Sequence, residues 1–349
     1  MTRKGFQITL DDIAEKMKVS KVTVSKALRG HPDISHETAK KIKKLARELG
    51  YHPNYMARNL SSRRSNTIGV VIPKIAHFFF SSVIEAIYDA AFESNYEIIM
   101  TVSQENAERE LKHIHSLLSM RVDGLIISVS EKTKDYSIFQ TVKDMGIPIT
   151  FMDRVVDVEG FNTVVADDRG GAFAATEQAI SIGYRKIGHL AGYQHINIGK
   201  ERYLGFESAM KKHGVPIRKE WVVQGGFGES DGYAGFMKLY ETGSLPDFIF
   251  TVTFPVALGM YRAAGELGLK IPDDIDLIGF GNSGLNQFLS PPMSYVEQPT
   301  TDLGRKAVQL TLENIKHGEQ FIPQHITLPT KLVLSKTGIK RPVGKKSRK

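Results

Sequence analysis

The chain has 349 residues, of which 41% are hydrophobic and 24% charged, so it is long enough for two or three globular domains. The absence of cysteine excludes disulfides, thiol catalysis and zinc sites built on thiolates. The net charge of +8 is unevenly spread: residues 1–66 contain 15 Lys and Arg against 6 Asp and Glu, whereas residues 67–338 contain 25 against 32.

The two basic ends have different interpretations. A basic first segment fits attraction to phosphates, where binding releases counterions and depends on salt. Residues 339–349 hold six basic side chains and no acidic one, and we expect a disordered tail there. No secretory signal opens the chain and no apolar run could span a bilayer, so we expect a cytoplasmic protein without membrane contact.

Three helices are predicted within the first fifty residues, and each begins after a capping side chain: Thr9, Ser20 and Ser35. Gly50 ends the third helix. Two short helices joined by a tight turn, with a third packed against them, are typical of a helix-turn-helix. Residues 1–52 are therefore predicted to form an all-α DNA-binding head.

The second predicted helix lies within VSKVTVSKALRG, residues 19–30. On a 3.6-residue period Val24, Ala27 and Leu28 share one face, and polar or basic side chains share the other. Such a face suits a polyanion, although a basic helix face alone favours nucleic acid only weakly. Residues 53–66, which include a short helix-capable piece and a polar, basic run, are predicted to be a hinge and linker.

From Thr67 onward, apolar runs such as IGVVIP, GLIISV and DFIFTV alternate with helical stretches. Alternating strands and helices with near-continuous apolar strands indicate parallel sheets covered on both faces. About ten strands suggest two doubly wound α/β lobes rather than one. The expected fold is therefore α/β, with an all-α head and a two-lobed body.

Residues 8–60, ITLDDIAEKMKVSKVTVSKALRGHPDISHETAKKIKKLARELGYHPNYMARNL, resemble the head and hinge of the lactose-repressor and galactose-repressor family. The segments PITFMDR, RYLGFESAMKKHGV and YVEQPTTDLGRKAVQL resemble that family's effector-binding body, which is similar to periplasmic sugar-binding proteins. The resemblance implies a homodimeric transcriptional regulator, expected to be a repressor, that binds a near-palindromic duplex and a sugar or sugar derivative. It also implies a body over 67–338, with lobe 1 at 67–167 and 297–322 and lobe 2 at 168–296 and 323–338.

The resemblance implies that Lys21 and Val22 contact bases in the major groove, with Lys26 one turn further along the same face. Hydroxyls and Arg29 are expected to position the head on phosphates. The full set of expected DNA contacts in the head is Thr9, Ser20, Lys21, Val22, Thr23, Ser25, Lys26, Arg29, Ser35 and Tyr51. The alternative is a merely solvated helix face.

In the hinge, Leu60 matches the leucine that wedges into the minor groove at the operator centre, with Ala57 nearby and Asn54 on the backbone. A segment this short is marginal as an isolated helix, so we expect it to form when two hinges pair on DNA. The alternative is a linker leucine packed on the body.

The effector site is expected between the lobes, at the carboxyl ends of the strands. Aromatic faces with Arg and Asp partners suit a polyhydroxylated ring. The resemblance implies contacts from His77, Phe79, Phe80, Asp153, Arg154, Asp168, Arg202, Thr253, Phe254 and Asn282. Phe78, Phe79 and Phe80 are not all expected to line the pocket, so at least one is predicted to be core.

Two departures from the family pattern bear on the effector. Thr253 and Phe254 stand where the family usually has Asn-Asp, and Gly281 stands where it often has Asp. Since Arg154 and Arg202 are kept while acids are lost, our hypothesis is an anionic or less hydroxylated effector, such as a phosphorylated or acidic sugar. A smaller departure is Lys18 in the helix-turn-helix turn, where the family often has Gly and a positive φ would strain Lys18.

Two alternatives come from other functional classes. GFGNSG, residues 279–284, fits the G-x-G-x-x-G pattern of an NAD-dependent oxidoreductase, but only LNQFL separates it from SPP and the next strand, too little for a crossover helix. A solute-binding protein is opposed by the basic head and the missing signal. No catalytic residue, metal site or cofactor is predicted, and the lack of an apolar heptad after Thr337 favours a dimer over a tetramer.

Overall fold

The head is a three-helix unit. The computed structural model describes residues 8–51, 64–75 and 78–339, and the chain divides into two compact units, residues 1–65 and 66–349. The head helices are α1 (Leu10–Met17), α2 (Lys21–Leu28) and α3 (His36–Glu48), and the predicted side chains cap all three. Ile13, Val24 and Ile42 are fully buried where the helices meet.

The turn between α1 and α2 carries the backbone strain expected there. Lys18 has φ of 52°, in the left-handed region that favours glycine. Its N–H still bonds the carbonyls of Ala14 and Glu15, so the turn that sets the angle between the two helices is closed.

The first lobe of the body is a six-stranded parallel sheet in the order β11-β5-β4-β3-β1-β2. Helices α5 and α12 pack on one face, and α6 and α7 pack on the other. The strands are β1 (Thr67–Ile72), β2 (Glu97–Val102), β3 (Gly124–Ile127), β4 (Ile149–Met152), β5 (Asn162–Ala166) and β11 (His325–Leu328). The helices are α5 (Phe78–Glu93), α6 (Ala107–Ser119), α7 (Ser137–Asp144) and α12 (Thr300–His317).

The second lobe repeats this architecture, with strand order β12-β10-β9-β8-β6-β7. Helices α8 and α9 cover one face, and α10 and α11 cover the other. The strands are β6 (Ile187–Ala191), β7 (Val222–Gln224), β8 (Phe248–Thr251), β9 (Asp276–Phe280), β10 (Ser294–Glu297) and β12 (Lys331–Val333). The helices are α8 (Asp168–Ser181), α9 (Asn197–Lys212), α10 (Glu229–Glu241) and α11 (Phe254–Glu266), with short 3-10 turns at Lys219–Trp221, Gly284–Phe288 and Gly318–Gln320.

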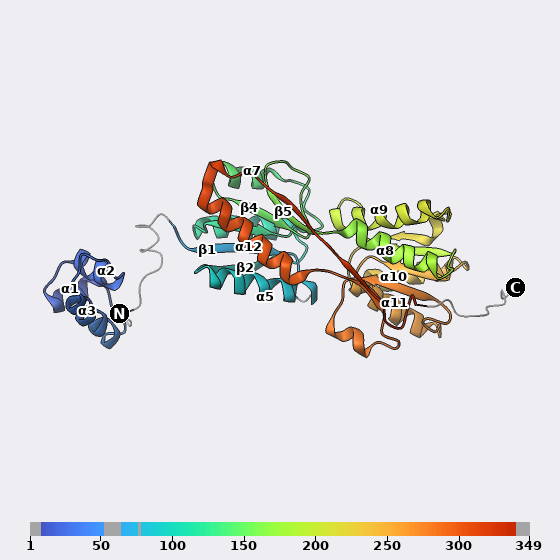
Figure 1. Ribbon diagram of the computed structural model, residues 1–349, viewed down its shortest axis with the longest axis horizontal. Coiled ribbons are helices and arrows are strands. Elements are labelled where there is room, and N and C mark those ends of the chain that lie inside the picture. The colour runs from blue at the N-terminus through green and yellow to red at the C-terminus, as the bar shows by residue number, and fades with distance from the viewer. Residues whose placement is uncertain (1–7, 52–63, 76–77, 340–349) are drawn as a thin grey trace, which may run out of the picture. The chain divides into compact units, whose positions relative to one another are not determined.

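Three crossings of the chain join the lobes, and Figure 1 shows the last of them as the long dark red segment. The chain passes from the first lobe to the second after β5, returns to the first lobe after β10, and enters the second lobe again after β11. The predicted lobe boundary near residue 322 is wrong, because β11 pairs with β5 in the first sheet and the chain crosses only after Leu328. The strand β12 is also antiparallel to β10. Both strands are short and half-exposed, so they lack the apolar runs that identified the other ten.

The crossing of α8 and α9 depends on a glycine. A Cβ on Gly205 would lie 2.2 Å from the carbonyl oxygen of Arg169 and 2.8 Å from Cβ of Ala172. The two helices therefore approach more closely than a larger residue permits. This contact holds the start of α8 beside α9, which matters because each helix carries one member of a buried ion pair.

We predict that Gly205→Ala lowers the free energy of unfolding by about 1–3 kcal/mol, because the added methyl meets backbone that can yield only by separating the helices. The control is Gly265→Ala in α11, where a Cβ would meet nothing within 4 Å. Because alanine has less conformational freedom than glycine in the unfolded chain, Gly265→Ala should raise the free energy of unfolding by about 0.5–1 kcal/mol. Urea unfolding of both variants measures this, and equal changes would contradict the account.

Candidate functional site

The outward face of α2 carries the predicted DNA-contacting side chains. Val22 is 62% exposed, whereas Val24, two residues on, is fully buried. The amine of Lys21 lies 2.7 Å from a carboxylate oxygen of Asp11, and that of Lys26 lies 2.7 Å from Asp33. An apolar side chain thus stands in solvent between amines whose surface ion pairs are weak and exchangeable.

The other head residues of the expected set divide into two groups. The side chains of Thr9, Ser20 and Ser35 accept backbone N–H groups at helix starts, so their first role is capping. Arg29 is exposed, and Thr23, Ser25 and Tyr51 are half-buried. The hinge residues Asn54, Ala57 and Leu60 lie outside the described residues, as does His77.

The body contains a cavity of about 230 Å³ between the lobes, at the carboxyl ends of the strands, and we call it the cleft cavity. The first turn of α5 and the segment after β4 line it from the first lobe. Helices α9 and α11 and the loop after β9 line it from the second. Its lining includes Phe78, Phe79, Phe80, Asp153, Arg154, Arg202, Phe227, Thr253, Phe254, Phe280, Asn282 and Glu297.

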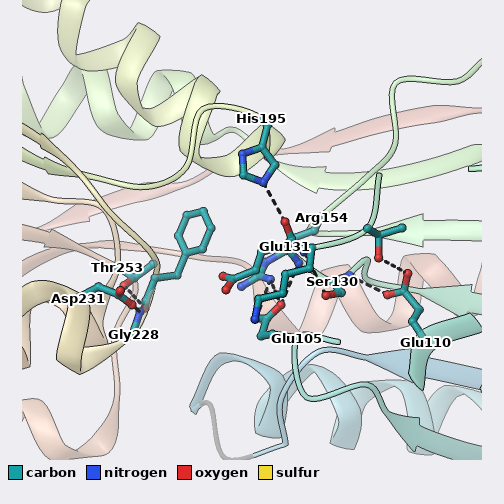
Figure 2. Close-up of polar contacts among 12 residues, drawn as sticks. Glu105, Glu110, Ser130, Glu131, Arg154, His195, Gly228, Asp231 and Thr253 are labelled. Atoms are coloured by element: carbon teal, nitrogen blue, oxygen red, sulfur yellow. Dashed lines mark hydrogen bonds and ion pairs between the residues drawn. The ribbon is translucent and has the colours of Figure 1, made fainter. Parts of the chain in front are cut away.

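On the first-lobe side, Arg154 is held by Glu105. Nη1 of Arg154 donates to both carboxylate oxygens of Glu105, at 2.8 and 3.0 Å (Figure 2), and both side chains are buried. The guanidinium also lies 4.9 Å from the ring centroid of Phe227. Because both charges are out of water, each requires the other.

On the second-lobe side, Arg202 is held by Asp168. Nε of Arg202 donates to Oδ1 of Asp168 at 2.8 Å, Nη2 forms an ion pair with the same oxygen at 2.7 Å, and Nη1 donates to the carbonyl of Val252 at 2.6 Å. The guanidinium stacks 3.7 Å from the ring centroid of Phe280. Burial raises the pKa of Asp168, and the charge of Arg202 opposes that rise.

Asp153 lies between these two ion pairs and has a different environment. It is 6% exposed, and its carboxylate forms no hydrogen bond with the residues that the structure describes. Burial raises the pKa of Asp153 to about 7, against the opposing charges of Arg154 and Arg202. Its backbone has φ of 63°, a left-handed conformation that costs energy in a residue other than glycine.

Asn197, at the start of α9, holds the backbone on both sides of Arg154. Its Nδ2 donates to the carbonyl of Asp153 at 2.8 Å, and its Oδ1 accepts the N–H of Val155 at 3.0 Å. These two bonds join the second lobe to the first. The orientation of Asp153 and Arg154 is therefore coupled to the position of α9, which carries Arg202.

Two further contacts join the lobes. Nε2 of His195 donates to the carbonyl of Glu131 at 2.8 Å (Figure 2), and the rings of Phe78 and Phe254 meet edge to face with centroids 6.3 Å apart. The loop that carries Glu131 is itself held by buried acids. Glu105 accepts the N–H of Glu131, and Glu110 accepts the N–H of Ser130 and the hydroxyl of Thr133.

Several predicted site residues take roles other than those expected. Phe78, Phe79 and Phe80 all line the cleft cavity, since α5 begins at Phe78 and its first turn faces the cavity. Phe80, only 2% exposed, also belongs to the core. Asp168 lies outside the lining and supports Arg202 from behind. The hydroxyl of Thr253 donates to the carbonyl of Phe227, so the Thr253 side chain has little left to offer a ligand.

The two arginines on which the hypothesis of an anionic effector rests are both engaged in buried ion pairs. The sequence hypothesis treated Arg154 and Arg202 as cations available to a ligand. Arg154 is already paired with Glu105, and Arg202 is already paired with Asp168. The sequence did not predict a role for Glu105. Glu105 lies 49 residues before Arg154 and has no spacing signal, and Asn197, Phe227 and Phe280 were missed for the same reason.

The glycine-rich loop GFGNSG does not form a dinucleotide site. It follows β9, but it leads into the 3-10 turn Gly284–Phe288 and then into β10, without the crossover helix whose N-terminus would bind pyrophosphate. Among the described residues no cluster of His, Asp or Glu could hold a metal ion. Within that same part of the chain, no helix combines the length and apolarity needed to cross a membrane.

We predict that Asp153→Asn makes the protein more stable at neutral and higher pH. Because the pKa of Asp153 is raised from 3.8 to about 7, the wild-type chain loses stability as pH rises through this interval. The asparagine variant escapes that loss and tolerates the left-handed φ. The difference in the free energy of unfolding, Asp153→Asn minus wild type, should therefore be up to about 4 kcal/mol larger at pH 8 than at pH 4. A pH-independent difference between the two proteins would contradict this.

Comparison with known proteins agrees with both units. Residues 9–54 match the model of bacterial regulatory proteins of the lacI family, and residues 176–337 match a periplasmic binding protein-like domain. Catabolite control protein A of Priestia megaterium is 31% identical over 307 residues, covering 87% of this chain and 92% of that protein. The HTH-type transcriptional repressor PurR of Actinobacillus pleuropneumoniae is 30% identical over 330 residues, covering 94% and 98%.

A solved structure extends the likeness to the whole chain. The lac repressor dimer bound to operator and the anti-inducer ONPF has a TM-score of 0.85 and 26% identity, covering 96% of this chain and 100% of that one. The family match of the head, the domain match of the body and the sequence relatives therefore indicate the same family. The chain belongs to the lacI family of bacterial regulatory proteins, which are DNA-binding regulators of transcription with a helix-turn-helix head.

Proposed function

We propose that this protein is a transcriptional repressor that binds a near-palindromic operator as a homodimer and releases or tightens its hold when a small metabolite occupies the cleft cavity. The observation that carries the proposal is the outward face of α2, where an exposed Val22 stands beside Lys21 and Lys26. The lac repressor dimer, whose structure was solved on its operator, supports the dimeric arrangement.

The chemistry of this face suits base recognition. A lysine amine can donate to guanine O6 or N7, and valine methyls can pack on a thymine methyl. The ion pair of Lys21 with Asp11 is exposed on both sides, so little energy is lost when the amine exchanges the carboxylate for a base. Arg29 is exposed at the end of α2 and would contact phosphate.

The hinge has a proposed role of its own. Leu60, with Ala57 beside it, would wedge into the minor groove at the operator centre, and Asn54 would contact the backbone. Unstacking one base step costs a few kcal/mol, so a flexible pyrimidine–purine step at the centre would lower that cost.

The effector would act through the relative position of the two lobes. The cleft cavity is lined from both lobes, and Asn197, His195 and the Phe78–Phe254 contact already connect them. A ligand that binds one lobe arrangement more tightly shifts the population toward it. The two hinges of a dimer would then be held at a separation that suits the operator or does not.

We predict that selection of duplexes from a random pool by the full-length protein returns a near-palindrome with a flexible central step. Lys21→Ala should cost about 1–3 kcal/mol on the preferred sequence and relax the preference at one position in each half-site. Failure to retain any duplex in dilute salt would contradict the proposal.

Arg29→Ala should behave differently from Lys21→Ala. Loss of a phosphate contact should weaken binding to every sequence and reduce the slope of log affinity against log salt by about 1 per contact. Lys44→Ala is the matched control, since Lys44 is exposed on α3 and pairs with Glu48. Equal effects of Lys21→Ala and Arg29→Ala on all sequences would overturn the assignment of base and phosphate contacts.

A further inference from the structure

The charges around the cleft cavity do not balance. Three buried carboxylates, Glu105, Asp153 and Asp168, surround two buried guanidiniums, Arg154 and Arg202. Each guanidinium is hydrogen-bonded to a carboxylate behind it, Glu105 for Arg154 and Asp168 for Arg202. The carboxylate that remains is Asp153, and it lines the cavity.

Nothing else in the described lining supplies the missing positive charge. Besides Asp153 and the two paired arginines, the charged residue that lines the cleft cavity in the described part of the chain is Glu297, which is also an acid. An anionic ligand would therefore enter a site of net negative charge, or would have to displace a buried carboxylate from its arginine.

We propose that the effector carries a protonated amine, which forms an ion pair with the carboxylate of Asp153, on a hydroxylated ring. This rests on the proposed function, because it takes the cleft cavity to be the effector site. It replaces the acidic sugar that the sequence suggested with a ligand of the opposite charge.

The aromatic lining fits a cationic ring. Phe227 and Phe280 already lie against Arg154 and Arg202. Phe79 and Phe254 also lie in the lining, and none of the described arginines lies over either ring, so these rings can pack on the ligand and attract its ammonium. A cation thus has both a counterion and aromatic neighbours in the same cavity.

The hydroxyl groups of the ligand also have a partner. Asn282 lines the cleft cavity, and its side-chain amide nitrogen can donate a hydrogen bond to a ligand hydroxyl.

The backbone that carries Asp153 is held in place. Asn197 bonds the carbonyl of Asp153 and the N–H of Val155, and Asp153 itself has a strained φ of 63°. Strain of this kind persists where surrounding contacts impose it, and it concentrates at binding sites. The backbone position from which the carboxylate reaches the cavity is therefore set before a ligand arrives.

The pairing has a pH signature. The groups that act on Asp153 are Arg154 and Arg202, which lower its pKa, and Asp168 and Glu105, which raise it along with burial. The empty site binds a proton with a pKa of about 7, whereas a bound ammonium requires the ionised form. Affinity for an amine should therefore rise with pH through neutrality, while affinity for a neutral ligand should not.

The test uses the full-length protein and two sets of probes. Each set contains an amine, a neutral compound and an acid on the same ring. One set is cyclohexylamine, cyclohexanol and cyclohexanecarboxylate; the other is 6-amino-6-deoxyglucose, glucose and glucose 6-phosphate. Calorimetry and thermal unfolding measure binding of each probe at pH 6 and pH 8. In at least one set, the amine should bind at least about tenfold more tightly than its neutral counterpart, and the acid should bind most weakly.

Two variants locate the effect. Asp153→Asn keeps the shape and the left-handed backbone, and it should abolish both the preference for the amine and its pH dependence. Asp157→Asn removes the same charge from an exposed position outside the lining and should leave both unchanged. Circular dichroism shows that each variant is folded.

The proposal is overturned if the neutral probe binds as tightly as the amine, if an acid binds best, or if no probe binds. Persistence of the amine preference in Asp153→Asn would overturn it as well. Duplex selection by the same preparation is independent of these results. A protein that selects an operator but prefers acids leaves the proposed function intact and refutes the charge assignment alone.

Discussion

Two guanidiniums buried in one cleft are the constraint on which the rest of the site depends. Each must be paired with a carboxylate, because an unpaired buried charge costs several kcal/mol. Arg154 obtains Glu105 from its own lobe, and Arg202 obtains Asp168 from its own lobe. Each lobe thus pairs its own arginine, and the carboxylate of Asp153, which also lines the cavity, has no hydrogen-bond partner among the described residues.

The fold brings these groups together through strand ends and helix starts. Arg154 follows β4, Asp168 opens α8 directly after the chain enters the second lobe, and Gly205 lets α9 approach α8 closely enough for Arg202 to reach Asp168. Asn197 then ties α9 back to the backbone around Arg154. Under the proposed function, a ligand that moves the backbone around Arg154 would therefore also move α9 and change the relative position of the lobes.

Local signals in the sequence were sufficient for the head and for most of the body. Thr9, Ser20 and Ser35 marked the helix starts, and apolar runs marked ten of the strands. The resemblance placed Asp153, Arg154 and Arg202 at the cavity. It did not reveal Glu105, because ion pairing across 49 residues leaves no periodic trace, and the hypothesis of an acidic effector was therefore made without that carboxylate. The strands β11 and β12 were missed because they are short and half-exposed.

The most direct test measures operator binding with and without a ligand in the cleft cavity. A fluorescent operator from the selected pool is titrated with full-length protein, with and without a saturating amine probe, and anisotropy gives the operator Kd. The account predicts that the probe changes this Kd at least about fivefold in the wild-type protein and not in Asp153→Asn. A probe that binds the cleft cavity of the wild-type protein by calorimetry, yet leaves its operator Kd unchanged, would contradict the claim that this cavity governs the DNA-binding head.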